Sequence, residues 1–177
     1  MKKIVVFLLI LFFSSCCLDT IKTRYFPPIE LDTVTVTKVI DGDTIEILID
    51  GENERVRLVG IDTPEPYSNN NEKKWYGLPD DHLRKWGIEA FDYTNKRLYK
   101  KEVNISYDTV QGQKDEFGRT LAYIYIGNKN FNLELVENGY ARVYTEKKSD
   151  LYLKLIEAET KARINKIGLW KYPLQDN

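Results

Sequence analysis

Two Asp-Gly pairs divide the segment from Thr33 to Ile61 into runs in which apolar and polar residues alternate. A period of two places successive side chains on opposite faces, which is typical of a β-strand with one buried face. Asp-Gly is also a frequent tight turn between antiparallel strands. The segment therefore predicts three strands in a meander, and this restricts the chain to folds that contain an antiparallel sheet.

The rest of the sequence predicts helices and two further strands. Pro64 and Pro66 end the third strand, because proline removes a backbone donor and restricts the residue before it. A polar loop is expected over 67–83, and the later elements are a helix at 83–99, strands at 103–107 and 120–126, a short helix from Asn132 to Gly139 and a last helix at 151–168. This order indicates an α+β fold, a five-stranded OB-type β-barrel with about three packed helices.

The first seventeen residues have a different composition from the rest of the chain. A basic start and an unbroken apolar run precede Ser14, Ser15, Cys16 and Cys17. This is the pattern of a signal peptide, and small residues before a cysteine are similar to a bacterial lipobox. We expect export and a lipid anchor on Cys16, although simple secretion with cleavage near Cys17 is an alternative. The predicted organisation is a signal peptide at 1–17, a tether at 18–32, one domain at 33–172 and a tail at 173–177.

Charge and cysteine content exclude some classes. Both cysteines lie in the leader, so the predicted domain has no disulfide and no cysteine zinc site. The net charge is −1, and removal of the leader takes away lysines and no acids. A protein that coats nucleic acid through bulk charge is usually basic, so any such contact must be local. The single histidine, His82, has no evident catalytic partners and is expected to be an ordinary surface residue.

Two acidic clusters lie at the ends of neighbouring predicted strands. Asp43 precedes the second strand and Asp62 follows the third, so pairing of these strands would bring the two carboxylates together. Carboxylate and carbonyl oxygens suit Ca²⁺, Mg²⁺ or Mn²⁺ better than Zn²⁺. Each cluster alone is also explained as a turn, because Asp-Gly and Asp-Thr-Pro are common turn sequences.

Two arginines strengthen the hypothesis of a phosphate site. Arg57 lies on the third strand and Arg119 opens the fifth. A guanidinium group binds phosphate oxygens bidentately and can stabilise the charge of a transition state. The alternative is that both arginines form solvated strand pairs of little energetic value.

Five sequence blocks in this order resemble the motifs of the micrococcal (staphylococcal) nuclease family. The resemblance extends from about Thr33 to Lys171. The blocks are Val39–Thr44 (VIDGDT), Val56–Glu65 (VRLVGIDTPE), Asp115–Arg119 (DEFGR) with Leu121–Tyr125 (LAYIY), Asn138–Ala141 (NGYA) and Gly168–Trp170 (GLW).

The resemblance implies a role for each matching residue. Asp43, Asp62 and the carbonyl of Thr63 would bind one Ca²⁺ ion. Glu65 would act as general base, or through its charge, and Arg57 and Arg119 would hold the reacting phosphate. The family cuts DNA and RNA and leaves 3′-phosphate and 5′-hydroxyl ends.

Three departures from the family pattern concern the substrate side. Phe117 stands where a tyrosine is expected, so a hydroxyl contact is missing. The segment between Glu65 and Glu89 is longer than in the reference nuclease. Tyr144 is the candidate for the tyrosine that contacts the nucleotide, whereas Tyr140 is expected in the core.

The prediction is therefore an exported, Ca²⁺-dependent nuclease with DNA, RNA or both as its substrate. It is expected to be a monomeric domain that is either membrane-anchored or secreted. One rival is an OB-type module that binds single strands without cutting them, and such a module needs a basic aromatic groove rather than Glu65 beside acids and arginines. The other rival is a structural surface lipoprotein, which the leader allows but which leaves the acids and arginines unexplained.

Overall fold

The computed structural model describes residues 31–172. The predicted leader with Cys16, nearly all of the tether and the tail lie outside the described residues. The strands are β1 (Asp32–Val39), β2 (Thr44–Ile49), β3 (Glu52–Leu58), β4 (Ile61–Asp62), β5 (Glu102–Tyr107), β6 (Thr120–Ile126), β7 (Lys129–Asn130) and β8 (Arg142–Val143). The α-helices are α1 (Asp80–Leu98), α2 (Phe131–Glu137) and α3 (Tyr152–Ile164), and the 3₁₀ turns are η1 (Glu72–Trp75) and η2 (Gly168–Lys171).

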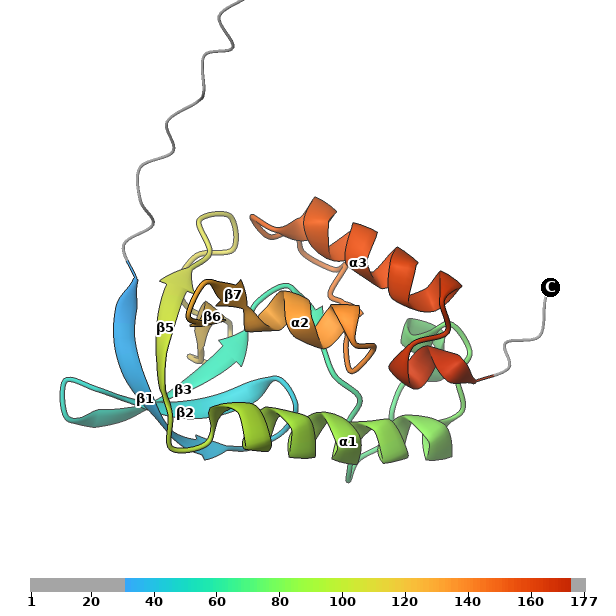
Figure 1. Ribbon diagram of the computed structural model, residues 1–177, viewed down its shortest axis with the longest axis horizontal. Helices are drawn as coiled ribbons and strands as arrows, with labels where there is room; N and C mark the ends of the chain where they lie inside the picture. Colours follow the sequence, from blue (N-terminus) through green and yellow to red (C-terminus); the bar gives the residue numbers. More distant parts are fainter. Residues whose placement is uncertain (1–30, 173–177) are drawn as a thin grey trace, which may run out of the picture.

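The main sheet closes into a barrel, which confirms the predicted OB-type α+β fold. Its strand order is β3-β2-β1-β5-β6-β7, and β3 also pairs in parallel with β6. That pairing closes the five strands β1, β2, β3, β5 and β6, so the barrel leaves few open edges. The barrel forms one side of the molecule, and α1 extends from the barrel to the opposite side, which carries η2 and α3 (Figure 1).

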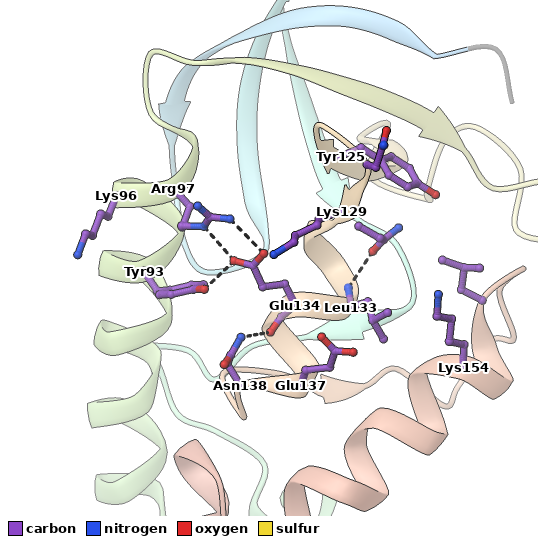
Figure 2. Close-up of a pocket in the computed structure, with 13 residues that line it drawn as sticks. Tyr93, Lys96, Arg97, Tyr125, Lys129, Leu133, Glu134, Glu137, Asn138 and Lys154 are labelled. Atoms are coloured by element: carbon purple, nitrogen blue, oxygen red, sulfur yellow. Dashed lines mark hydrogen bonds and ion pairs between the residues drawn. The ribbon is translucent and has the colours of Figure 1, made fainter.

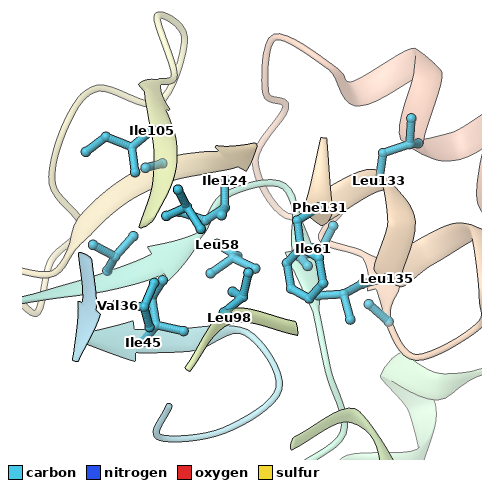
Figure 3. Close-up of a cluster of buried hydrophobic side chains, with 14 of the residues drawn as sticks. Val36, Ile45, Leu58, Ile61, Leu98, Ile105, Ile124, Phe131, Leu133 and Leu135 are labelled. Atoms are coloured by element: carbon cyan, nitrogen blue, oxygen red, sulfur yellow. The ribbon is translucent and has the colours of Figure 1, made fainter. Parts of the chain in front are cut away.

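Aliphatic side chains from every barrel strand fill the interior. Figure 3 shows this core, in which Val36, Ile45, Leu58, Ile105 and Ile124 of the barrel meet the helical residues Leu98, Phe131 and Leu135. All of these side chains are almost completely buried. Burial of that kind contributes roughly 1.5–3 kcal/mol for each large apolar side chain, so the core fixes the barrel and its helices as one unit.

The predicted polar loop at 67–83 contains structure that its composition did not indicate. Trp75 and Leu78 are buried and pack with Leu83, Leu169 and Trp170 in a second cluster under α1 and η2. The helix α1 also begins earlier than predicted, at Asp80. A loop that carries buried aromatic and aliphatic side chains is anchored to the domain rather than free of it.

Three other predicted boundaries were wrong. The third strand ends at Leu58 rather than Ile61, because Gly60 has a positive φ of 79° and turns the chain into the short strand β4. The short helix is capped by Asn130, whose side chain accepts a hydrogen bond from the Leu133 N–H, rather than by Asn132. The last helix ends at Ile164, before Gly168.

Within residues 31–172, none of the helices has both the length and the apolar character that a membrane crossing requires.

Candidate active site

Asp43 is a buried carboxylate in the turn immediately before β2. Its side chain accepts hydrogen bonds from the N–H of Thr63 at 2.5 Å and from the Thr63 hydroxyl at 3.0 Å. Pairing of β2 with β3 sets this position, since the N–H of Leu58 donates to the carbonyl of Asp43 at 2.8 Å. The two acidic clusters predicted from the sequence are therefore joined directly.

The preceding glycine explains how the two turns approach so closely. A Cβ atom at Gly42 would lie 2.7 Å from the Cβ of Ala90 and 2.7 Å from the Thr63 hydroxyl oxygen. The Gly42 carbonyl also accepts a hydrogen bond from Thr94 at 2.7 Å. Helix α1, which carries Ala90 and Thr94, is therefore the platform on which the first turn rests.

One guanidinium group links the two aspartates. Nη1 of Arg57 lies 2.6 Å from Oδ1 of Asp43, and Nη2 lies 2.9 Å from Oδ1 of Asp62. Arg57 is mostly buried, with 14% of its side chain exposed. In a poorly hydrated setting such charge-assisted bonds fix the geometry of all three groups. The structure thus brings Asp43, Arg57 and Asp62 together.

Sequence reasoning missed a second arginine at Asp62. Strand β8 pairs with β4 so that Arg142 lies opposite Asp62, and its Nε and Nη2 lie 3.0 and 2.7 Å from Oδ2. Arg142 also pairs with Glu146 at 3.2 Å and lies over the Trp75 ring at 5.4 Å. The strand has only two residues, which is too short for a periodic pattern. The one available signal was an arginine directly after the Asn138–Ala141 block.

Glu65 faces the same site from the loop after β4. Partial burial raises the pKa of its carboxyl, and the neighbouring Asp41 and Asp62 raise it further, against the effect of Arg57 and Arg119. A hollow of about 300 Å³ is lined by these groups, and the lining residues include Asp41, Asp43, Arg57, Asp62, Glu65, Arg119 and Tyr144. An elevated carboxyl pKa in a hollow is one property of a group that accepts a proton near neutral pH.

Arg119 lies at the rim of this hollow. Its Nε donates to Oδ2 of Asp115 at 2.7 Å, and its guanidinium carbon lies 5.4 Å from the centre of the Phe117 ring. Asp115 also accepts from the backbone N–H groups of Phe117 and Arg119 at 2.9 Å each. The Asp115–Arg119 turn therefore orients the guanidinium before any ligand binds.

Tyr144, Tyr140 and His82 lie in three different environments. Tyr144 lines the hollow and is half-buried, whereas Tyr140 stacks on Tyr93 at 4.4 Å and packs against the core. His82 does not line the hollow that holds Asp43, Asp62 and Glu65. Its Nε2 lies 2.7 Å from the carbonyl oxygen of Leu169, so it connects α1 with η2 and is not the ordinary surface residue that was expected.

The donor set of the hollow suits a hard cation. Burial raises the pKa of Asp43 well above its usual range, and Asp41 and Asp62 raise it further, although Arg57 opposes them. The main cause is burial, so the Asp43 carboxylate lies in a poorly hydrated place beside two other acids. Within residues 31–172 no three acidic, histidine or cysteine side chains form a metal-binding group. Asp43 and Asp62 contribute carboxylate oxygens, which are the ligand type that an ion such as Ca²⁺ accepts together with water.

A larger hollow elsewhere has a different chemistry. Figure 2 shows this second hollow, of about 840 Å³, between α1, α2 and the start of α3. Its central carboxylate, Glu134, accepts hydrogen bonds from Arg97 at 2.9 and 3.1 Å and from Tyr93 at 2.6 Å. Glu134 is paired with Arg97 and Tyr93, and three lysines also line this hollow, namely Lys96, Lys129 and Lys154. It therefore lacks the group of neighbouring acids that lines the first hollow.

The fold and the first hollow together define a class, an OB-type barrel with acids and guanidinium groups gathered in one hollow. The family model described as "Staphylococcal nuclease homologue" matches residues 55–172. The chain belongs to this family, and it is a hydrolase of the nuclease type.

Individual relatives agree with this assignment. The chain is similar to an uncharacterized protein of Methanocaldococcus jannaschii, with 40% identity over 77% of this chain and 70% of the relative. It is also similar to the thermonuclease of Staphylococcus intermedius, with 38% identity over 79% of this chain and 77% of the relative. Endonuclease YncB of Bacillus subtilis is 29% identical over 80% of this chain and 63% of the relative.

Proposed function

We propose that this chain is a Ca²⁺-dependent nuclease that acts outside the cytoplasm and hydrolyses phosphodiester bonds of DNA, RNA or both. The products would be 3′-phosphate and 5′-hydroxyl ends. The observation that carries the proposal is the meeting of Asp43 and Asp62 on Arg57, in a hollow that Glu65 and Arg119 also line.

In this proposal Asp43, Asp62 and the Thr63 carbonyl hold one Ca²⁺ ion. When bound, the ion would polarise a phosphate oxygen and offset charge at the reacting group. The support comes from oxygen donors alone, in a place where burial and neighbouring carboxylates raise the pKa of Asp43. Ca²⁺ accepts irregular shells of carboxylate, carbonyl and water oxygens, whereas Mg²⁺ favours a tight octahedron.

Glu65 would accept a proton from the attacking water. The water oxygen then forms a bond to phosphorus while the bond from phosphorus to the 5′ oxygen breaks, and the 5′ oxygen takes up a proton as it leaves. An acceptor is most effective when its pKa lies near the working pH, and the environment of Glu65 shifts its pKa in that direction.

Arg57 and Arg119 would stabilise the charge that develops on the phosphate oxygens. Among the described residues, Arg119 bonds to Asp115 through Nε, which leaves its terminal amino groups able to donate to a ligand. Guanidinium donors that are already oriented cost no reorganisation during the reaction. Tyr144 lines the same hollow and would contact the sugar or base beside the phosphate.

The nuclease assay that tests this proposal uses supercoiled plasmid and a single-stranded RNA with Ca²⁺ or with EDTA. We expect cleavage with Ca²⁺, its loss in EDTA, and 3′-phosphate ends that block extension until a phosphatase is added. Full cleavage in excess chelator would refute the metal assignment. Binding without cleavage under every condition would instead support a non-catalytic OB-type module.

Export and anchoring belong to the same proposal and rest on the sequence of the leader. Lipidation of Cys16 would hold the domain at a membrane surface, and stable tethering needs more than one acyl chain. Labelled palmitate should enter the wild-type chain and Cys17→Ala, but not Cys16→Ala. Incorporation that depends on Cys17 instead would move the anchor to that residue, and no incorporation would indicate simple secretion.

A further inference from the structure

The peptide backbone of Glu65 is bound by the side chain of Asn70. The Glu65 N–H donates to Oδ1 of Asn70 at 2.8 Å, and Nδ2 of Asn70 donates to the Glu65 carbonyl at 3.0 Å. The amide therefore matches both the donor and the acceptor of a single residue. Pro64 and Pro66 flank Glu65 and have no N–H groups, so this segment cannot be held by an ordinary ladder of backbone bonds.

Asn70 is itself fixed to the first turn of α1. Its N–H and Nδ2 both donate to Oδ1 of Asp80, at 2.7 and 3.1 Å. The other carboxylate oxygen of Asp80 pairs with Nε of Arg84 at 2.7 Å, and Arg84 also bonds to Asn69. A continuous set of hydrogen bonds therefore runs from the start of α1 to the backbone of Glu65.

Helix α1 also contacts the Glu65 segment directly. A Cβ atom at Gly87 would lie 2.6 Å from the Pro64 carbonyl oxygen, 2.7 Å from the Pro66 nitrogen and 2.9 Å from the Glu65 carbonyl carbon. All of these are backbone atoms, which cannot rotate away as a flexible side chain would. Gly87 is the residue that allows α1 to support this segment from below.

We propose that Asn70 is a positioning residue that holds Glu65 at the reacting phosphate. Helix α1 supports this arrangement, because Asp80 binds Asn70 and Gly87 lets the helix contact the Glu65 backbone. The inference rests on the proposed function and assigns a role to the longer segment between Glu65 and Glu89. Glu65 is partly exposed and lines the hollow from the loop after β4, so the position of its carboxylate depends on where its backbone is fixed. An error of about 1 Å in the position of a reacting group can cost on the order of 100-fold in rate.

The first test is the steady-state kinetics of Asn70→Ala on a short oligonucleotide. The expected result is a kcat lower by roughly 10- to 100-fold with KM changed little, because Asn70 touches Glu65 rather than the substrate. Asn71→Ala is the matched control in the same loop, since its side chain accepts a hydrogen bond from the Lys73 N–H and has no part in the set that reaches Glu65. Equal losses in both variants would refute a specific role for Asn70.

The second test places Asn70→Ala in the background of Glu65→Gln. If Asn70 acts through the Glu65 carboxylate, its removal should lower kcat by less than about threefold in that background, because coupled residues are not additive. A full additional loss would show that Asn70 only maintains the loop and would overturn the proposal. Asn70→Gln keeps the amide and provides a second variant, with the same non-additivity expected, should Asn70→Ala fail to fold.

The proposed function and the positioning role of Asn70 can be refuted independently. If Glu65→Gln retains the wild-type kcat, then Glu65 is not the proton acceptor, whatever Asn70→Ala does. If Glu65→Gln is impaired but Asn70→Ala keeps the wild-type kcat, the nuclease assignment stands and only the positioning role is refuted.

Discussion

The carboxylate of Asp62 receives two hydrogen bonds from Arg142, which lies 80 residues further along the chain. Only 4% of the Arg142 side chain is exposed. Arg57 binds the other oxygen of the same carboxylate at 2.9 Å. Asp62 is therefore oriented from both sides, and the pairing of β4 with β8 becomes part of the site.

Loss of Arg142 should destabilise the domain. Arg142→Met would leave the Asp62 carboxylate with Arg57 alone, and removal of one partner of a buried pair costs about 3–5 kcal/mol. We expect a value near the lower limit, because Asp62 retains Arg57. Urea unfolding measures the change. Arg55→Met is the control, since Arg55 is 56% exposed in its pair with Glu46 and such pairs contribute roughly 0–1 kcal/mol. Equal midpoint shifts for both variants would contradict this account.

The barrel could be predicted from sequence because its strands alternate regularly and its turns have distinctive residues. Local irregularities in its strands could not be predicted in this way. Strict alternation from Val34 would place Val39 on the outer face, but a register shift between Val36 and Lys38 turns Val39 inward. A bulge of this kind depends on pairing with β2 rather than on local sequence.

The site could be predicted only in part for a related reason. Asp43 and Asp62 follow from the pairing of neighbouring strands, and the structure does bring them together on Arg57. Arg142 depends instead on a pairing between segments far apart in the chain. Asn70 lies in a loop whose polar composition gave no indication that it binds Glu65. Contacts of long sequence separation leave no periodic trace.

Acid should weaken the anchoring of the loop at Asp80. Hydrogen bonds from the Asn70 N–H, from Arg84 and from the Asn70 side chain lower the pKa of Asp80 to about 2. A lowered pKa in the folded state means that the stabilisation is present above about pH 4 and is lost as the pH falls toward 2. The midpoint of urea unfolding for Asp80→Asn should therefore lie below that of the wild type at pH 6, and the two should converge near pH 2. A constant difference across this range would contradict the assignment.

Phe117→Tyr should add a hydroxyl beside the phosphate. Phe117 is 76% exposed and lies against Arg119, so the added oxygen would meet no packed neighbours. One net hydrogen bond should tighten a 5′-phosphorylated nucleotide inhibitor by roughly 0.5–1.5 kcal/mol. Calorimetric titration measures the affinity, and Tyr67→Phe, which removes an exposed hydroxyl elsewhere on the surface, is the control. An unchanged affinity would mean that the phosphate lies beyond the reach of residue 117.

The nature of the Arg119 contact distinguishes an enzyme from a binding module. Arg119→Lys keeps the charge but loses the planar fork that Asp115 orients through Nε. If Arg119 stabilises developing charge, kcat should fall by roughly 10²–10³ while the affinity for a non-cleavable substrate analogue changes little. Arg97→Lys, at the second hollow where Arg97 pairs with Glu134, is the matched control and should leave both quantities unchanged.

Glu65→Gln completes the comparison because it removes a proton acceptor without removing a binding group. The variant keeps the size of the side chain, so the affinity for nucleotide should be nearly constant while kcat falls by roughly 10²–10⁴. A transition-state role predicts that both Glu65→Gln and Arg119→Lys act on kcat. A binding role predicts the reverse pattern, in which Arg119→Lys weakens single-strand affinity and Glu65→Gln has no effect. The first pattern changes kcat and the second changes the binding affinity, so one set of kinetic and binding measurements distinguishes them.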